Sequence, residues 1–147
     1  LKDGEDRRRS VYIQVRRSLP LGMLETFDAP SMTPNCEVRT SSTVAPQALL
    51  LMNNDDVLAV ARQFADRVRE DAGNETRGQV RRAWRLALGT APTTHEVDRA
   101  VRFLTEQQAR FAAQPDAAGD ADDDPERLAL TTFCQFLISS NAFLYVD

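Results

Sequence analysis

Glu25 and Asp28 are the side chains whose type and spacing most suggest catalysis. They are three residues apart, so they could share one side of a helical turn. Neighbouring carboxyl groups can serve as a general acid and a general base. Nearby arginines, among them Arg17 and Arg39, support a second interpretation in which both carboxylates form structural ion pairs. Glu25 and Asp28 are therefore catalytic candidates, and the structural interpretation stays open beside them.

A second group of side chains offers charge, hydrogen bonds or an aromatic face. Gln47 and Asn53 flank an apolar helical stretch, and their amides can pair with sugar hydroxyls, although helix caps use such amides more often. Tyr12 and Trp84 can stack on a sugar ring, but Trp84 lies on an apolar helical face, which favours core packing. The binding candidates are Arg8, Tyr12, Arg17, Arg39, Gln47 and Asn53.

Motifs that hold metals or cofactors are missing from the sequence. His95 is the only histidine and Cys36 and Cys134 the only cysteines, too few for a structural zinc site. His95 falls inside a helix start, where we expect it to be exposed. Cys134 lies in an apolar helical stretch, so a buried thiol is favoured over a disulfide with Cys36. There is no CxxCH, nucleophile elbow or glycine-rich phosphate loop, so no metal or cofactor is predicted in this chain.

The charge of the chain argues against nucleic-acid binding. The formal net charge is −4, with 14 basic against 12 acidic residues in 1–85 and 4 against 10 in 86–147. Seventeen of the 18 basic residues are arginine, which suits anion binding but also follows from a GC-rich genome. No predicted helix has a basic face, and no apolar run is long enough to span a membrane. The start on LKDGEDRRRS, without an initiator methionine, is expected of a cut inside a longer protein.

The hydrophobic pattern predicts a mainly α fold of four or five helices. After a short extended segment at 11–15 and a proline-containing loop at 19–34, apolar residues recur at helical spacing. The predicted helices cover about 42–54, 55–70, 80–88, 93–113 and 125–138, with a polar break at 73–78. Gly89, Pro92 and a capping box from Thr93 to Glu96 mark the third helix stop and the fourth helix start.

The predicted organisation is a single domain over 1–147, with an extended arm at 1–42 and a helical core at 43–147. The stretch 125–138 is apolar almost all round, so we expect it at the centre of the bundle. Residues 114–126 form an acidic loop. Its alternating aspartates lack the glycine and the terminal glutamate of a calcium loop, which favours a solvated connection. The apolar tail 143–146 is expected to dock.

Three separated motifs together resemble one protein family. They are RRRSVYIQVRRSLPLGMLETFDAPSM with PNCEVR and SSTVAPQALLLMNN in 7–54, RRAWRLALGTAPTTHEV in 81–97 and FCQFLISSNAFLYVD in 133–147. These motifs make the chain similar to the PSD family. That family is a planctomycete-type, cytochrome-C-associated C-terminal domain of unknown function. The acidic loop lies outside the resemblance. The family supplies no catalytic residues to carry over.

The resemblance implies a place in a larger protein. Such proteins are exported, to the periplasm or beyond, and often carry a c-type cytochrome-like module upstream, so haem is implied there and not in this chain. The leading functional hypothesis is an accessory or interaction domain whose partners are other domains of the same protein. The alternative is part of an enzyme that acts on polysaccharide or in haem-linked redox chemistry.

Overall fold

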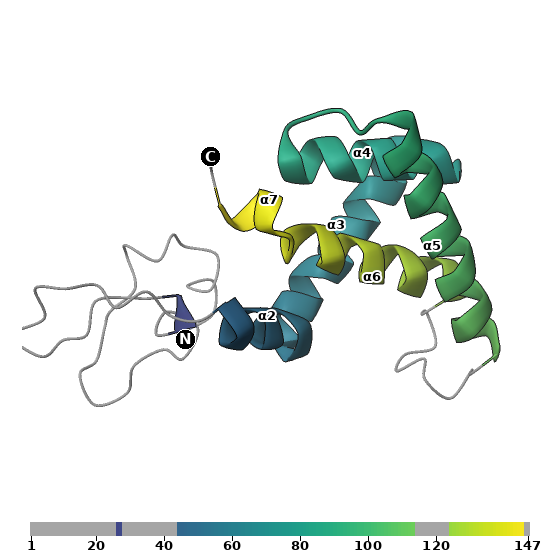
Figure 1. The fold of residues 1–147 in the computed structure, drawn as a ribbon. Coiled ribbons are helices and arrows are strands. Elements are labelled where there is room, and N and C mark those ends of the chain that lie inside the picture. Colours follow the sequence, from purple (N-terminus) through teal and green to yellow (C-terminus); the bar gives the residue numbers. More distant parts are fainter. Residues whose placement is uncertain (1–25, 28–43, 114–123, 146–147) are drawn as a thin grey trace, which may run out of the picture. The chain divides into compact units, whose positions relative to one another are not determined.

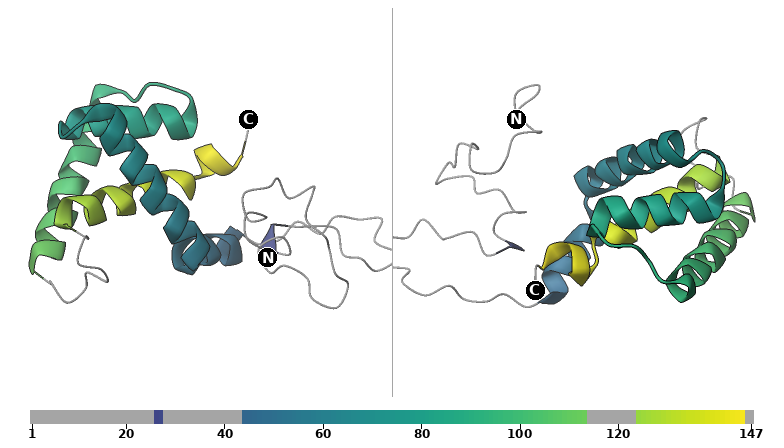
Figure 2. Two further views of the ribbon diagram at one scale, coloured as in Figure 1. Left: turned by 180° about the vertical axis from the view of Figure 1, so that it is seen from behind. Right: turned by 90° about the horizontal axis from the view of Figure 1, so that it is seen from above.

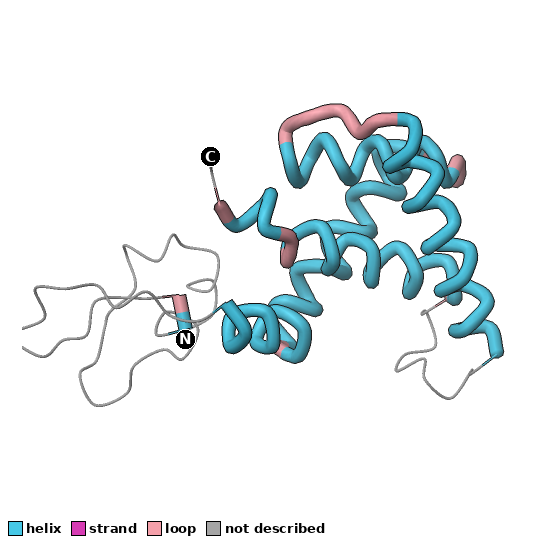
Figure 3. Tube along the Cα trace, viewed as in Figure 1, coloured by secondary structure: helices cyan, strands magenta, loops and turns pink. Residues whose placement is uncertain are grey.

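The computed structural model of the 147-residue chain describes residues 26–27, 44–113 and 124–145. Within these residues the regular elements are helices only, which confirms the predicted mainly α fold (Figures 1 and 3). The helices are α2 (Val44–Asn53), α3 (Asp55–Ala72), α4 (Thr76–Leu88), α5 (Thr94–Ala113), α6 (Pro125–Ile138) and α7 (Asn141–Leu144). The chain divides into two units, Leu1–Leu50 and Leu51–Asp147, each described by itself.

The second unit is built around α6. This helix packs against α3, α4 and α5, and Figures 1 and 2 show it crossing α3. Its core-facing side chains include Leu130, Phe133 and Leu137, each at most 2% exposed. The ring of Phe133 packs on Phe103 of α5 with 6.5 Å between ring centroids. The prediction that the last long helix lies at the centre of the bundle is therefore confirmed.

One side of α6 departs from the prediction of a helix buried all round. Phe136 is 60% exposed, because α3, α4 and α5 cover only part of the circumference of α6. The apolar tail predicted at 143–146 also departs from the prediction. Its first two residues belong to the short helix α7, which contacts α4 and α6. Phe143 and Tyr145 nevertheless stay 46% and 50% exposed, so the tail docks only in part.

The core between α3, α4 and α6 is lined by small residues. Ala61 and Ala65 of α3 and Ala83 of α4 are completely buried. A side chain that ends at Cβ allows two helix backbones to approach closely, since little volume has to fit between them. The helical spacing in the sequence predicts that one face of α3 is apolar, formed by Val57, Ala61, Phe64, Ala65 and Val68. The structure buries this face, except that Phe64 is only half-buried.

The helix boundaries show which capping predictions hold. Asn54 Oδ1 accepts the amides of Asp56 and Val57 at 2.9 and 3.2 Å, so it caps α3. Gly89 ends α4 with φ +70°, as predicted for a left-handed C-cap. The capping box is present too: Glu96 Oε2 accepts from the Thr93 amide at 2.7 Å, and Thr93 Oγ1 accepts from the Glu96 amide at 3.3 Å. The pKa of Glu96 is lowered first by the hydrogen bond from the Thr93 amide to its carboxylate, and then by the one that the Thr93 hydroxyl donates to Oε2 at 2.7 Å.

The predicted break at 73–78 is wrong at its second half. Helix α3 continues to Ala72 and α4 already begins at Thr76. Glu75 caps α4 by accepting the Arg77 amide at 3.0 Å on Oε1. Gly78 lies in the first turn of α4, where a Cβ would stand 2.7 Å from the other Glu75 carboxylate oxygen. Gly78 thus makes room for the capping side chain and does not end a helix.

A bidentate ion pair ties α3 to the start of α6. Arg127 Nε and Nη2 donate to the two carboxylate oxygens of Asp66 at 2.8 and 3.0 Å. The hydrogen bond from Arg127 is the main cause that lowers the pKa of Asp66, and the charge of Arg69 adds to it. Asp124 completes this end of the core, because its carboxylate caps α6 through the Arg127 amide at 2.6 Å. With Asp124 as its N-cap and Pro125 as its first residue, α6 begins where the sequence predicts a helix at 125–138.

We expect the Asp66→Asn variant to be less sensitive to acid than the wild type. A carboxyl group whose folded-state pKa lies below the unfolded value contributes stability at higher pH and loses it as pH falls through the folded-state pKa. Asp66 has a lowered pKa, so its contribution is complete above about pH 5 and declines below it. The variant lacks that contribution even at neutral pH, and for this partly exposed pair the contribution is about 1 kcal/mol. Urea unfolding at pH 6 and pH 3 should show a smaller drop in the variant. Equal drops in the two proteins would contradict the assignment.

Candidate functional site

Of the catalytic and binding candidates named from the sequence, the described residues include two, Gln47 and Asn53. The others lie outside the described residues, and their proposed roles stay predictions: Arg8, Tyr12, Arg17, Glu25, Asp28, Arg39. The extended segment at 11–15 and Cys36 also lie outside the described residues. So do residues 114–123 of the acidic loop.

Gln47 and Asn53 are not brought together as a binding pair. Gln47 is buried, and its Nε2 donates to the Thr26 carbonyl at 3.1 Å. That hydrogen bond satisfies a backbone acceptor, which is a structural use of the amide. Asn53 ends α2 and is exposed. The two amides therefore face different surroundings on one helix.

Cys134 and His95 do not form a reactive centre. Cys134 is a free, fully buried thiol, and burial raises its pKa to about 12. A thiol with so high a pKa holds almost no thiolate at neutral pH, so Cys134 is a core residue, as the sequence favours. His95 is exposed in the first turn of α5, also as predicted.

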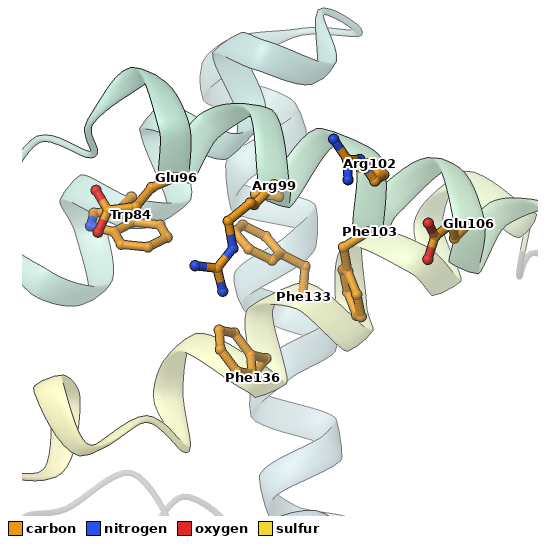
Figure 4. Close-up of a pocket in the computed structure, with 9 residues that line it drawn as sticks. Trp84, Glu96, Arg99, Arg102, Phe103, Glu106, Phe133 and Phe136 are labelled. Atoms are coloured by element: carbon orange, nitrogen blue, oxygen red, sulfur yellow. The ribbon is translucent and has the colours of Figure 1, made fainter.

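An aromatic groove lies where α4, α5 and α6 meet, all within the second unit. Its volume is about 520 Å³. Trp84 comes from α4, Phe103 from α5, and Phe133 and Phe136 from α6. Figure 4 shows Trp84 on one side of the groove and Phe136 on the other, with the guanidinium group of Arg99 between them. We call this site the aromatic groove; it is lined by Trp84, Glu96, Arg99, Ala100, Arg102, Phe103, Glu106, Phe133 and Phe136.

Charged side chains of α5 border the aromatic groove. Arg99 and Arg102 contribute two positive charges, and Glu96 and Glu106 contribute two negative ones. In Figure 4 the guanidinium of Arg99 extends from α5 toward the rings of Phe133 and Phe136. Arg99 also lies close enough to Glu96 for its charge to lower the pKa of that carboxyl group, after the hydrogen bonds from Thr93.

The sequence contained a signal for this site that reasoning from single motifs missed. Glu96, Arg99, Phe103 and Glu106 follow one another at intervals of three, four and three residues, which places them on one side of α5. An aromatic residue between charges on a helix face is unlike either a core stripe or a fully solvated face. Trp84 was predicted to pack in the core, and it does so only in part: it is half-buried and lines the groove.

The part of the chain that the structure describes contains neither a metal-binding group of side chains nor a membrane-spanning helix. Among residues 26–27, 44–113 and 124–145, no group of three or more His, Cys, Asp or Glu side chains is placed to hold a metal ion. Across the same residues, no helix has the length and apolar character that crossing a bilayer requires.

The fold and the groove define a small helical unit with a central helix and one aromatic, charge-bordered surface. A family model described as PSD1, Protein of unknown function (DUF1553), matches residues 1–104. The chain belongs to this family. The matched range contains the motifs at 7–54 and 81–97, whereas the motif at 133–147 follows it. No curated protein and no solved structure matches the chain.

Proposed function

We propose that this chain is an accessory interaction domain of an exported multidomain protein of the planctomycete type, and that a c-type cytochrome-like module of the same protein is its partner. Membership of the DUF1553 family is the ground from which the proposal starts. The motifs at 7–54, 81–97 and 133–147, which resemble the cytochrome-associated members of that family, support the finer part of it.

The observation that carries the proposal is the surface of α2. Leu51 of this helix is buried, at 5% exposed. Leu49 and Met52, which project from the other side of α2, are 63% and 69% exposed. A ten-residue helix with large apolar side chains on two sides can pack against one apolar surface on each side. This chain supplies the surface that covers Leu51, and we assign the surface that covers Leu49 and Met52 to a partner domain.

The backbone of α2 is also held firmly enough to present such a surface. Gln135 Nε2 of α6 donates to the carbonyls of Leu51 and Met52 at 3.1 and 3.2 Å. These bonds satisfy two of the carbonyls that a helix leaves unpaired in its last turn. The side chain of Met52 therefore projects from a fixed backbone, which lowers the entropy cost of binding.

Met52→Lys tests the proposal. We expect the wild-type chain to bind the separately produced c-type cytochrome-like module in isothermal titration calorimetry. The variant should bind at least tenfold more weakly, about 1.4 kcal/mol, because a charge replaces an apolar contact. Gln63→Lys, at an exposed position of α3, is the control and should bind as the wild type does. Equal affinities of both variants, or no binding by the wild type, would refute the proposed interaction.

A further inference from the structure

We propose that the aromatic groove between α4, α5 and α6 binds a neutral saccharide. This inference goes beyond the proposed interdomain function, because it concerns a different surface and a different class of ligand. Three properties of the groove support it: the placement of its aromatic rings, the balance of its charges, and its volume.

The aromatic rings provide surfaces for stacking. Trp84 and Phe136 stand on opposite sides of the groove, on α4 and α6, and Phe136 is 60% exposed (Figure 4). A pyranose ring has an apolar face of C–H groups that packs on an aromatic ring, where burial of apolar area supplies the binding free energy. Phe133, at 2% exposed, fixes the floor of the groove from the core. The surface for stacking is therefore held by a packed interior.

The charges around the rings are balanced and supply both kinds of hydrogen-bonding group. Arg99 and Arg102 are donors, and Glu96 and Glu106 are acceptors. The capping box uses Oε2 of Glu96, so Oε1 is left to accept a further hydrogen bond. Sugar hydroxyls both donate and accept, so a mixed border of guanidinium and carboxylate groups suits them.

The same balance argues against the other ligands that stack on aromatic rings. A nucleotide or a single-stranded nucleic acid brings phosphates, whose binding needs an excess of positive charge. The lining residues have two positive and two negative charges, and the whole chain has a formal net charge of −4. The groove volume of about 520 Å³ falls in the range of small-molecule sites. A short stretch of a neutral oligosaccharide carries no phosphate, and its size suits a groove of this volume.

Trp84 makes the test direct, because it is the only tryptophan in the chain. Its fluorescence, excited selectively over tyrosine, reports on the aromatic groove and on no other site. The 147-residue chain is titrated with cellohexaose, xylohexaose and maltohexaose, and in parallel with hexagalacturonate and ATP as anionic counterparts. We expect saturable quenching or a spectral shift with at least one neutral hexasaccharide, and at least tenfold weaker binding of both anionic ligands. No response to any neutral hexasaccharide, or equal binding of an anionic ligand, overturns the proposal.

Variants at the groove show whether the response arises there. Phe136→Ala should weaken saccharide binding at least tenfold, whereas Phe143→Ala, at an exposed aromatic residue outside the groove lining, should bind as the wild type does. Arg99→Gln should also weaken binding, with Arg110→Gln as the matched control on α5. Unchanged binding by both Phe136→Ala and Arg99→Gln would overturn the proposal.

The two proposals fail separately. Met52→Lys lies on α2, outside the groove lining, so it should leave saccharide binding unchanged. If the cytochrome-like module protects Trp84 from quenching while no neutral saccharide binds, the groove is a protein interface and the saccharide proposal is overturned. If a neutral saccharide binds and the module does not, the interdomain proposal is overturned and the saccharide proposal stands.

Discussion

Replacing Phe133 by alanine is expected to lower the free energy of unfolding by about 3–5 kcal/mol. Phe133 is 2% exposed on α6, the helix that packs against α3, α4 and α5, and it contacts Phe103. The substitution removes an aromatic ring from the middle of the core and leaves a cavity that rigid helices fill only in part. Urea unfolding followed by circular dichroism measures the loss.

Phe136→Ala is the matched control for this first prediction. The residue type and the helix are the same, and the position is three residues further on, but the side chain is 60% exposed. Exposed substitutions of this kind usually change stability by no more than about 0.5 kcal/mol. A loss below about 1 kcal/mol for Phe133→Ala, or equal losses for the two variants, would contradict a fold centred on α6.

Enlarging Ala65 is the second change with a large expected effect. Ala65 is fully buried on the face of α3 that the core covers, and α3 packs there against α4 and α6. A leucine at this position must push the helices apart or adopt a strained rotamer, which typically costs about 1–3 kcal/mol. We expect Ala65→Leu to lower the midpoint of urea unfolding accordingly.

Ala59→Leu separates packing from helix propensity. Ala59 is on the same helix but exposed, and alanine and leucine differ little in helix propensity. This variant should therefore retain the stability of the wild type to within about 0.5 kcal/mol. If Ala65→Leu is as stable as Ala59→Leu, the interface of α3 is not closely packed, and the account of the core is wrong.

Most of the helical fold could be predicted because its signals are local. The stops and starts at Gly89, Thr93 and Asp124 depend on residues within one turn of the helix end, so the sequence alone contains them. The start of α4 was missed because Glu75 caps with a long carboxylate side chain, and Gly78 looks like a breaker when its neighbour is not considered. A helix start capped by a glutamate is therefore harder to recognise in a sequence than one marked by a capping box.

The aromatic groove could not be predicted in the same way. The sequence shows that 125–138 is apolar on nearly every side, but not which side its neighbours leave uncovered. That depends on how α4 and α5 cross α6, which decides that Phe133 is buried and that Phe136 is not. The charged residues of α5 likewise border a groove only because the fold brings Trp84 of α4 to the same site.

The catalytic candidates Glu25 and Asp28 lie outside the described residues, so acid–base chemistry stays a prediction from the sequence. Its structural alternative, ion pairing with the arginines of the same segment, stays open with it. The double variant Glu25→Gln with Asp28→Asn removes both charges and keeps the side-chain shapes, so its stability distinguishes the two interpretations. Loss of the charges would lower stability if the carboxylates are structural partners, and would leave it nearly intact if they are catalytic.

Amide hydrogen exchange of the 147-residue chain, alone and with the c-type cytochrome-like module, tests the central claim of an interaction domain most directly. We expect slower exchange in α2, Val44–Asn53, when the module is present, because a bound partner suppresses local opening of that helix. Helix α5, away from the proposed contact, should exchange at an unchanged rate. Equal exchange rates in α2 with and without the module would contradict the proposed function.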